Sequence, residues 1–199
     1  MKRQYLFVTL SILLLSAKAN CQSKSDTTFY FGNYLWTVTI PAGFRLYSEE
    51  GKKALADKET QNLKQFNGTG NKGYVDTKIF IAEYSWGNSF SASLASSTDN
   101  EIKWKTQLYQ ARKNTYLFRQ QRNPGTTIDS VTTTIKSGIY NFSSFEVTLK
   151  KTNYPTLHIL SMECLLGSMV LHIDVVYKDE KLWPIMRETI INSKISKGH

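Results

Sequence analysis

The sequence has few of the residues that catalytic and metal sites most often use. Its 199 residues include two cysteines, Cys21 and Cys164, and three histidines, His158, His172 and His199. Two cysteines exclude a disulfide-rich scaffold and a thiol-rich zinc site. The sequence contains neither a G-x-S-x-G nucleophile motif nor a G-x-x-x-x-G-K-[ST] phosphate loop. We therefore expect a protein that is not an enzyme and that uses no cofactor.

Long apolar runs are also scarce, and the most prominent one stands at the amino terminus. Lys2 and Arg3 precede an apolar stretch over residues 6–16, which is shorter than the roughly 20 residues that cross a bilayer. Ala17-Lys18-Ala19 then supplies a small-x-small cleavage sequence. We predict a signal peptide over residues 1–19, cleaved after Ala19, and export to the periplasm or the extracellular space. A retained anchor or a core helix is the alternative.

Cys21 follows the predicted cleavage site, where a bacterial lipoprotein would carry its lipid. Lys18 and Asn20 occupy positions at which lipoproteins have small or aliphatic residues, so lipidation is the less favoured alternative. Export would also permit a disulfide between Cys21 and Cys164. Cys164 lies in an apolar segment, which favours a buried free thiol. The sequence leaves open whether Cys21 is lipidated, free or bridged.

Acidic residues are fewer than basic ones, and the formal net charge is +9. Removal of Lys2, Arg3 and Lys18 with the signal peptide leaves 22 basic and 16 acidic residues, a charge of +6. This balance favours anionic partners such as acidic proteins or lipid head groups, so peripheral membrane association is an open alternative. The basic residues form no long run, and export disfavours nucleic acid, so we expect no nucleic-acid partner.

The remaining pattern predicts one α+β domain over residues 29–196, after a flexible lead-in at 20–28. We expect a mainly antiparallel sheet of five to seven strands covered by about three helices. A capping box at Thr98 and Glu101 predicts the start of the middle helix, which ends near Arg122. The Ser- and Gly-rich residues 85–98 are predicted to form a loop. The predicted strands span 35–40, 77–84, 130–135, 144–150, 157–165 and 168–177, and the other helices span 49–66 and 182–190.

Two short segments carry a resemblance to a known family, namely Thr39-Ile40-Pro41-Ala42-Gly43-Phe44 and Ile190-Ile191-Asn192-Ser193-Lys194-Ile195. The first is similar to the opening strand, and the second to the closing segment, of the PsbP-like fold family, which includes PsbP, Mog and DcrB-type exported proteins. The resemblance covers most of residues 30–195. It implies an extracytoplasmic scaffold for docking, and it supplies neither a catalytic constellation nor binding residues.

The carboxyl-terminal hairpin carries the candidate polar cluster. A two-residue turn at Leu166-Gly167 would place Ser161 opposite His172 and Glu163 opposite Val170. Strand alternation then puts Ser161, Glu163, His172 and Asp174 on one face. A small polar site or a pH-sensitive patch is the functional interpretation. A half-solvated strand face is the interpretation we favour, because single histidines in sheets seldom bind metal. His158 lies on the opposite, apolar face and is predicted to be a hydrogen-bonded core histidine.

These observations predict an exported accessory or binding protein of the periplasm or cell envelope, which docks a protein partner through a sheet face or a groove. A carrier of a small apolar ligand is the first alternative, and a hydrolase is the second. The sequence does not indicate the identity of the partner or the oligomeric state.

Overall fold

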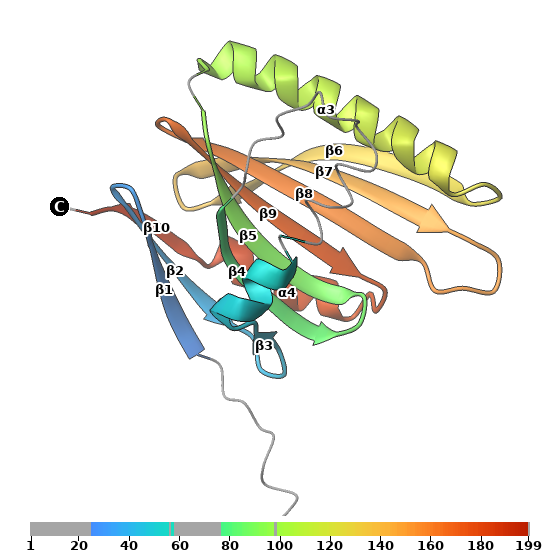
Figure 1. Cartoon of the computed structure of the whole chain (residues 1–199), viewed down its shortest axis with the longest axis horizontal. Helices are drawn as coiled ribbons and strands as arrows, with labels where there is room; N and C mark the ends of the chain where they lie inside the picture. Colours follow the sequence, from blue (N-terminus) through green and yellow to red (C-terminus); the bar gives the residue numbers. More distant parts are fainter. Residues whose placement is uncertain (1–24, 56, 58–76, 98, 199) are drawn as a thin grey trace, which may run out of the picture.

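The computed structural model describes residues 25–55, 57, 77–97 and 99–198. The predicted signal peptide, its cleavage site and Cys21 lie outside the described residues. Within the described part, the chain forms two antiparallel sheets with helices packed against them (Figure 1), which confirms the predicted α+β class. None of the described helices has both the length and the apolar character needed to cross a membrane.

The main sheet has seven strands in the order β3-β4-β5-β9-β8-β7-β6. Two of its hairpins close with two-residue turns that begin at Gly138 and Gly167, whose φ angles are 57° and 63°. Glycine fits this left-handed region because it has no Cβ to clash with the backbone. The strands are β3 (Arg45–Leu46), β4 (Thr77–Ser85), β5 (Asn88–Ser96), β6 (Thr127–Ser137), β7 (Tyr140–Lys150), β8 (Leu157–Leu166) and β9 (Met169–Tyr177).

The second sheet contains β1 (Ser25–Phe31), β2 (Tyr34–Ile40) and β10 (Lys194–Lys197), in the order β1-β2-β10. Residues 25–28, predicted to be part of a flexible lead-in, belong instead to β1 and pair with β2. The sequence around them explains this, because threonine and aromatic residues favour an extended, half-buried strand. The strand β10 was also not predicted.

The segment 85–98, predicted to be a loop, contains β5 and corrects that prediction. Phe90 and Ala92 point into the core and are almost fully buried, while Ser89, Ser91 and Ser93 alternate with them. The period of two is present in the sequence. Its serines made it resemble a loop, although they occupy the polar face of a strand in the middle of the sheet.

Three helical segments accompany the sheets in the described part of the chain. A helix begins at residue 49 and runs to residue 55, and the rest of the predicted helix 49–66 lies almost entirely outside the described residues. Helix α4 (Leu182–Ile191) agrees with its prediction. Helix α3 (Glu101–Arg122) ends where predicted, but its N-cap is Asn100, two residues later than the predicted cap. The Asn100 side chain accepts a hydrogen bond from the amide of Lys103 at 2.9 Å.

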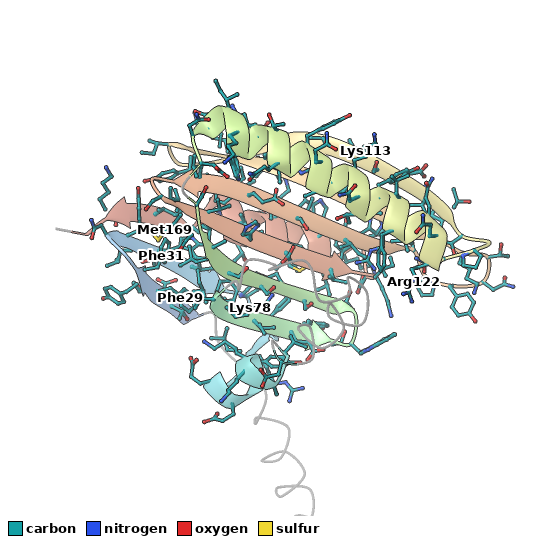
Figure 2. All side chains as sticks on the ribbon, turned by 45° about the horizontal axis from the view of Figure 1, so that its top comes forward. Phe29, Phe31, Lys78, Lys113, Arg122 and Met169 are labelled. Atoms are coloured by element: carbon teal, nitrogen blue, oxygen red, sulfur yellow. The ribbon has the colours of Figure 1, made fainter. Side chains whose placement is uncertain are left out.

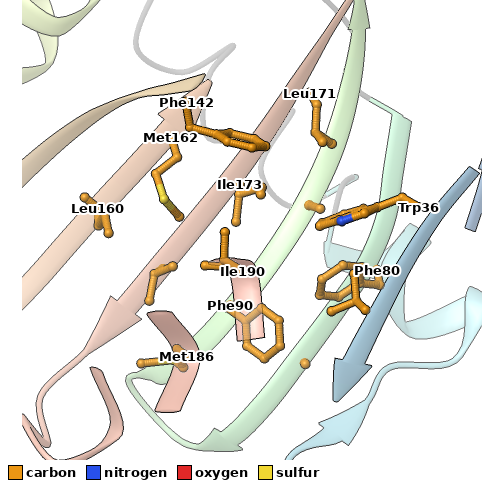
Figure 3. Close-up of a cluster of buried hydrophobic side chains, with 14 of the residues drawn as sticks. Trp36, Phe80, Phe90, Phe142, Leu160, Met162, Leu171, Ile173, Met186 and Ile190 are labelled. Atoms are coloured by element: carbon orange, nitrogen blue, oxygen red, sulfur yellow. The ribbon is translucent and has the colours of Figure 1, made fainter. Parts of the chain in front are cut away.

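The two faces of the main sheet differ in what covers them. On one face, apolar side chains of β4, β5, β8 and β9 pack against β2 and α4, and Trp36, Ile173 and Met186 are fully buried there (Figure 3). On the other face, α3 crosses a smaller apolar cluster of Phe145, Val147 and Leu149. The second face also contains polar side chains, so it is where the candidate polar cluster lies.

Cys164 is a buried free thiol within the core, as the sequence predicts, and burial raises its pKa to about 11. In the variant Cys21→Ser, we expect iodoacetamide at pH 9 to leave Cys164 unmodified in the native protein. The reagent should modify it fully once guanidinium unfolds the chain, because the thiolate is the reacting form. Mass spectrometry of the alkylated protein measures both states, and rapid native labelling would contradict a buried thiol.

Candidate functional site

The four residues of the candidate polar cluster lie on one face of β8 and β9, as alternation predicts. Their register differs from the prediction, because Glu163 lies opposite His172 and Ser161 lies opposite Asp174. The turn consists of Gly167 and Ser168 rather than Leu166 and Gly167. The pairing between β8 and β9 therefore shifts by two residues. Each residue gains a different cross-strand partner, but its side chain stays on the predicted face of the sheet.

Glu163 is bound by an arginine that the sequence does not connect with it. Arg112 of α3 contacts the Glu163 carboxylate at 2.6 Å, and the two side chains are 11% and 7% exposed. The same guanidinium donates hydrogen bonds to the hydroxyl and carbonyl oxygens of Ser143, at 3.0 and 2.9 Å. It also lies 5.6 Å from the ring centre of Phe145. Arg112 therefore ties α3 to both β7 and β8.

Burial is the dominant influence on the Glu163 carboxyl. It raises the pKa of this group above the ordinary value, although Arg112 acts in the opposite direction. Removing two charges from water can cost more than their attraction returns. The ion pair therefore fixes the position of α3, while its net contribution to stability is small compared with that of a well-packed apolar pair.

The rest of the polar cluster is held by a short hydrogen bond. The Ser161 hydroxyl donates to the Asp174 carboxylate at 2.8 Å. Its proton therefore points to a carboxylate rather than to the imidazole of His172. Among the described residues, no three His, Cys, Asp or Glu side chains are grouped so that they could hold a metal ion. With Glu163 bound by Arg112, the contacts of the cluster serve the packing of α3 and the sheet.

His158 lies on the core face of the main sheet, in a stack of three aromatic rings. Its ring is parallel to that of Tyr177, with centroids 4.4 Å apart, and Tyr177 in turn stacks on Trp183 at 5.6 Å. The Nδ1 atom of His158 lies 2.7 Å from a Glu146 oxygen that also accepts a hydrogen bond from Tyr177. The predicted core histidine thus has a partner at Nδ1, while Nε2 has no hydrogen bond and lies 3.9 Å from Glu180.

A groove of about 430 Å³ lies between the two sheets, and we call it the β1 groove. Aromatic and apolar side chains from four strands form much of its wall, with polar residues beside them. Figure 2 shows Phe29, Phe31, Lys78 and Met169 around it. Its lining residues are Phe29, Tyr30, Phe31 and Gly32 of β1 and its turn, Thr77, Lys78 and Ile79 of β4, Leu94, Ala95 and Ser96 of β5, and Met169 of β9.

The β1 groove was missed by sequence reasoning because two of its four strands were not predicted. Half of β1 was assigned to the lead-in, and β5 was assigned to a loop. A signal was present in Thr28-Phe29-Tyr30-Phe31, in which Phe29 and Phe31 share one face and Tyr30 points to the other. Nothing in the sequence shows that this face meets β4 and β5, since that contact depends on the arrangement of the sheets.

The edge of β1 beside the groove has backbone groups without a partner among the described residues. In the described part of the chain, β1 pairs with β2 alone, from Ser25–Ile40 to Phe31–Tyr34. A two-residue turn follows Phe31, so Phe31 and Tyr34 form the closing hydrogen-bonded pair. By alternation, the amide and carbonyl groups of Thr28 and Tyr30 point away from β2.

These features define an α+β protein with a seven-stranded antiparallel sheet, a smaller second sheet and a groove between them that has both apolar and polar lining residues. No protein-family profile and no curated protein matches the sequence. The fold is similar to the solution structure of cyanobacterial PsbP (CyanoP) from Synechocystis sp. PCC 6803, with a TM-score of 0.52 and 7% identity. This match covers 87% of the present chain and 94% of CyanoP.

A second solved structure, LpqN of Mycobacterium tuberculosis, described as involved in cell envelope biogenesis, gives a TM-score of 0.46 and 11% identity. The matched region covers 88% of this chain and 92% of LpqN. The match to CyanoP shows that the chain has the PsbP-like fold that its sequence motifs suggested. At these identities the likeness concerns the fold alone.

The buried pair between Arg112 and Glu163 makes a stability prediction. Glu163→Ala should lower the free energy of unfolding by about 3–5 kcal/mol, because it leaves the guanidinium buried without its partner. The double variant Arg112→Met, Glu163→Leu should recover most of this loss, since an apolar pair carries no desolvation cost. Urea denaturation monitored by circular dichroism measures each value.

A matched control for this prediction is Asp129→Ala. It removes an ion pair with Lys150 in which the oxygen and nitrogen are 3.5 Å apart and both side chains are more than half exposed. Exposed pairs contribute about 0–1 kcal/mol, so this variant should unfold almost as the parent does. Equal losses in Glu163→Ala and Asp129→Ala would contradict the role given to the buried pair.

Proposed function

We propose that this protein is an exported binding protein that docks an extended segment of a partner protein in the β1 groove. The observation that carries the proposal is the position of the groove, which lies directly beside free backbone groups of an edge strand. The proposal assigns binding, and no reaction, to the protein.

An edge strand and a groove together suit an extended peptide. A partner segment added to β1 would form hydrogen bonds with the backbone of Thr28 and Tyr30, which gives affinity without a fixed sequence. Every second side chain of that segment would face the groove, where Phe29, Leu94 and Met169 offer apolar contact. Side chains in such positions supply the specificity of strand addition.

The proposed place of action rests on the amino terminus of the sequence. The charged start, the short apolar run and the Ala17-Lys18-Ala19 site support a signal peptide and export. An exported binding protein would meet its partner in the periplasm or at the cell envelope. The fold is compatible with this role but does not select it, because one fold serves many functions.

A carrier of a small apolar ligand is the second candidate, and the volume of the groove favours it. Pockets for small molecules commonly have volumes of about 300–1,000 Å³, and the groove has about 430 Å³. Its lining includes four strands with aromatic and aliphatic side chains. The free backbone edge beside it is the reason that we place a peptide first.

Site-specific photocrosslinking tests the proposed function. The photoreactive residue benzoylphenylalanine would replace Tyr30, whose side chain is 77% exposed on the outer face of β1, where it would lie beside every second side chain of an added strand. The matched control position is Tyr154, which is 66% exposed and lies in the loop between β7 and β8. In an envelope extract, we expect one crosslinked protein from position 30 and none of the same mass from position 154.

The variant Tyr30→Ala should reduce recovery of that partner at least about tenfold, which corresponds to roughly 1.4 kcal/mol of binding free energy. Tyr154→Ala should leave recovery unchanged. Identical crosslinks at both positions, or none at position 30, would refute docking in the groove. A small molecule that native mass spectrometry finds bound to the parent, and that Met169→Lys displaces, would establish the carrier instead.

A further inference from the structure

We propose that the outer edge of β6 is a second docking site, which takes an extended acidic segment of a partner protein as an eighth strand of the main sheet. This inference goes beyond the proposed function, because the site is separate from the β1 groove. The groove lies beside β4 and β5, whereas β6 is the last strand at the opposite edge of the sheet.

The edge of β6 is long and exposed. The strand has eleven residues and pairs along its whole length with β7, from Thr127–Lys150 to Ser137–Tyr140. Residues 129–134 are all exposed, and Val131 is 51% exposed. Among the described strands, β7 is the only one that pairs with β6. The opposite end strand, β3, has two residues, so β6 offers much the longer template.

The hairpin geometry shows which backbone groups point outward. Ser137 and Tyr140 flank a two-residue turn and form its closing hydrogen-bonded pair. The even-numbered residues of β6 therefore direct their amide and carbonyl groups away from β7. The Tyr116 hydroxyl donates to the carbonyl of Ile128 at 3.3 Å, which agrees with this orientation.

Beyond Ile128, the outward groups belong to Ser130, Thr132, Thr134 and Lys136. No backbone hydrogen bond from the described residues outside the sheet reaches them. Natural edge strands are usually protected by proline, by charges or by short length. β6 contains no proline, and its middle, Val131 to Ile135, consists of residues that favour strands. The edge therefore retains the features that permit strand addition.

Charge selects the partner. Helix α3 runs alongside β6 (Figure 1), and Figure 2 shows Lys113 and Arg122 projecting from it. Ile128 of β6 packs with Tyr116 of α3. Because side chains alternate along a strand, the other even-numbered residues of β6, including Thr132, Thr134 and Lys136, lie on the same side of the sheet as α3. The acidic side chains nearby, Asp129 and Glu146, lie on the opposite face, where Glu146 pairs with Val131.

An added strand would therefore meet positive charge on its α3 side. Aspartate or glutamate at every second position would place a carboxylate beside this charge, while the intervening side chains would face Val131. Complementary charges of this kind chiefly raise the rate and the specificity of association. An acidic segment of alternating pattern is the chemistry that fits.

A second copy of the chain fits this edge less well. Two antiparallel β6 strands related by a two-fold axis perpendicular to the sheet would keep both α3 helices on the same face. Helix α3 contains six basic residues and one acidic residue. Pairing of two copies would bring two such helices toward each other, where like charges repel.

Nuclear magnetic resonance with a synthetic peptide tests the proposal. The probe is a capped nine-residue peptide of alternating valine and glutamate, and its control has lysine in place of glutamate. At low salt, the glutamate peptide should shift the amide resonances of Ser130, Thr132 and Thr134. The lysine peptide should bind at least about tenfold more weakly, because its charges repel Lys113 and Lys136.

A pair of substitutions at one position separates backbone pairing from side-chain contact. Thr132→Pro removes an outward amide without removing a hydrogen bond to β7, and it should weaken binding of the glutamate peptide at least about tenfold. Thr132→Ala keeps the amide and should bind within about twofold of the parent. Should Thr132→Pro fail to fold, the difference in affinity of the parent protein for the glutamate and lysine peptides still tests the proposal.

Three outcomes would overturn the proposal. Shifts confined to Thr28 and Tyr30 would place the acidic peptide at β1 instead. Equal binding of both peptides would remove the charge argument. Sedimentation that shows a dimer of the mature chain, abolished by Thr132→Pro, would assign the edge to a second copy. Only the first of these results concerns β1, and it would not contradict the Tyr30 crosslink, so the two proposals fail independently.

Discussion

Glu163 lies in the middle of the main sheet with little exposure to water. The structure of the sheet face under α3 depends on the groups that compensate the charge of the Glu163 carboxylate. A buried carboxylate requires a cation and hydrogen-bond donors nearby. Helix α3 supplies both through Arg112, which contacts Glu163, Ser143 and Phe145. The helix has no fully buried residue. Its place over the sheet is therefore set by one arginine and a few half-buried neighbours rather than by a broad apolar face.

This mode of attachment determines what the protein presents to its surroundings. The half-buried side chains of α3 form a narrow seam that includes Trp104, Leu108, Arg112 and Tyr116. Other large side chains of the helix, such as Ile102 and Tyr109, stay exposed. Helix α3 lies over one face of the sheet, where Arg112 contacts β7 and β8 and Tyr116 contacts the start of β6, so the outer edge of β6 has no partner strand among the described residues. The buried ion pair thus indirectly leaves a basic helix beside a strand whose outer edge has no partner in the described part of the chain.

The sequence predicts the parts of the fold that short-range signals specify. Glycines at positive φ identify the hairpins at Gly138 and Gly167, and the apolar period of α4 identifies that helix. Prediction from the sequence fails for the elements whose structure depends on tertiary contacts. The serines of β5 conceal a central strand, and the hairpin register depends on which two residues form the turn. On α3 the apolar residues Ala111 and Phe118 are exposed, whereas Arg112 faces the sheet.

The candidate sites show the same division. The shared face of Ser161, Glu163, His172 and Asp174 follows from alternation alone, and the structure reproduces it. The partner of Glu163 lies 51 residues earlier in the chain, and no local pattern connects the two. An arginine on a helix is ordinarily assigned to the solvent side, so only the packing of α3 on the sheet reveals its role. The β1 groove likewise exists only once β1, β4, β5 and β9 have been brought together.

The two edges proposed as docking sites, those of β1 and β6, share one backbone chemistry and differ in their surroundings. Strand addition by itself discriminates poorly, because every peptide has the same amide and carbonyl groups. Specificity must come from the side chains next to each edge. At β1 they include aromatic and aliphatic side chains together with Lys78, so selection there depends more on burial of apolar area than it does at β6. At β6 they are cationic, and selection there weakens as ionic strength shortens the range of the charges. One small fold can thereby distinguish two extended segments by different forces.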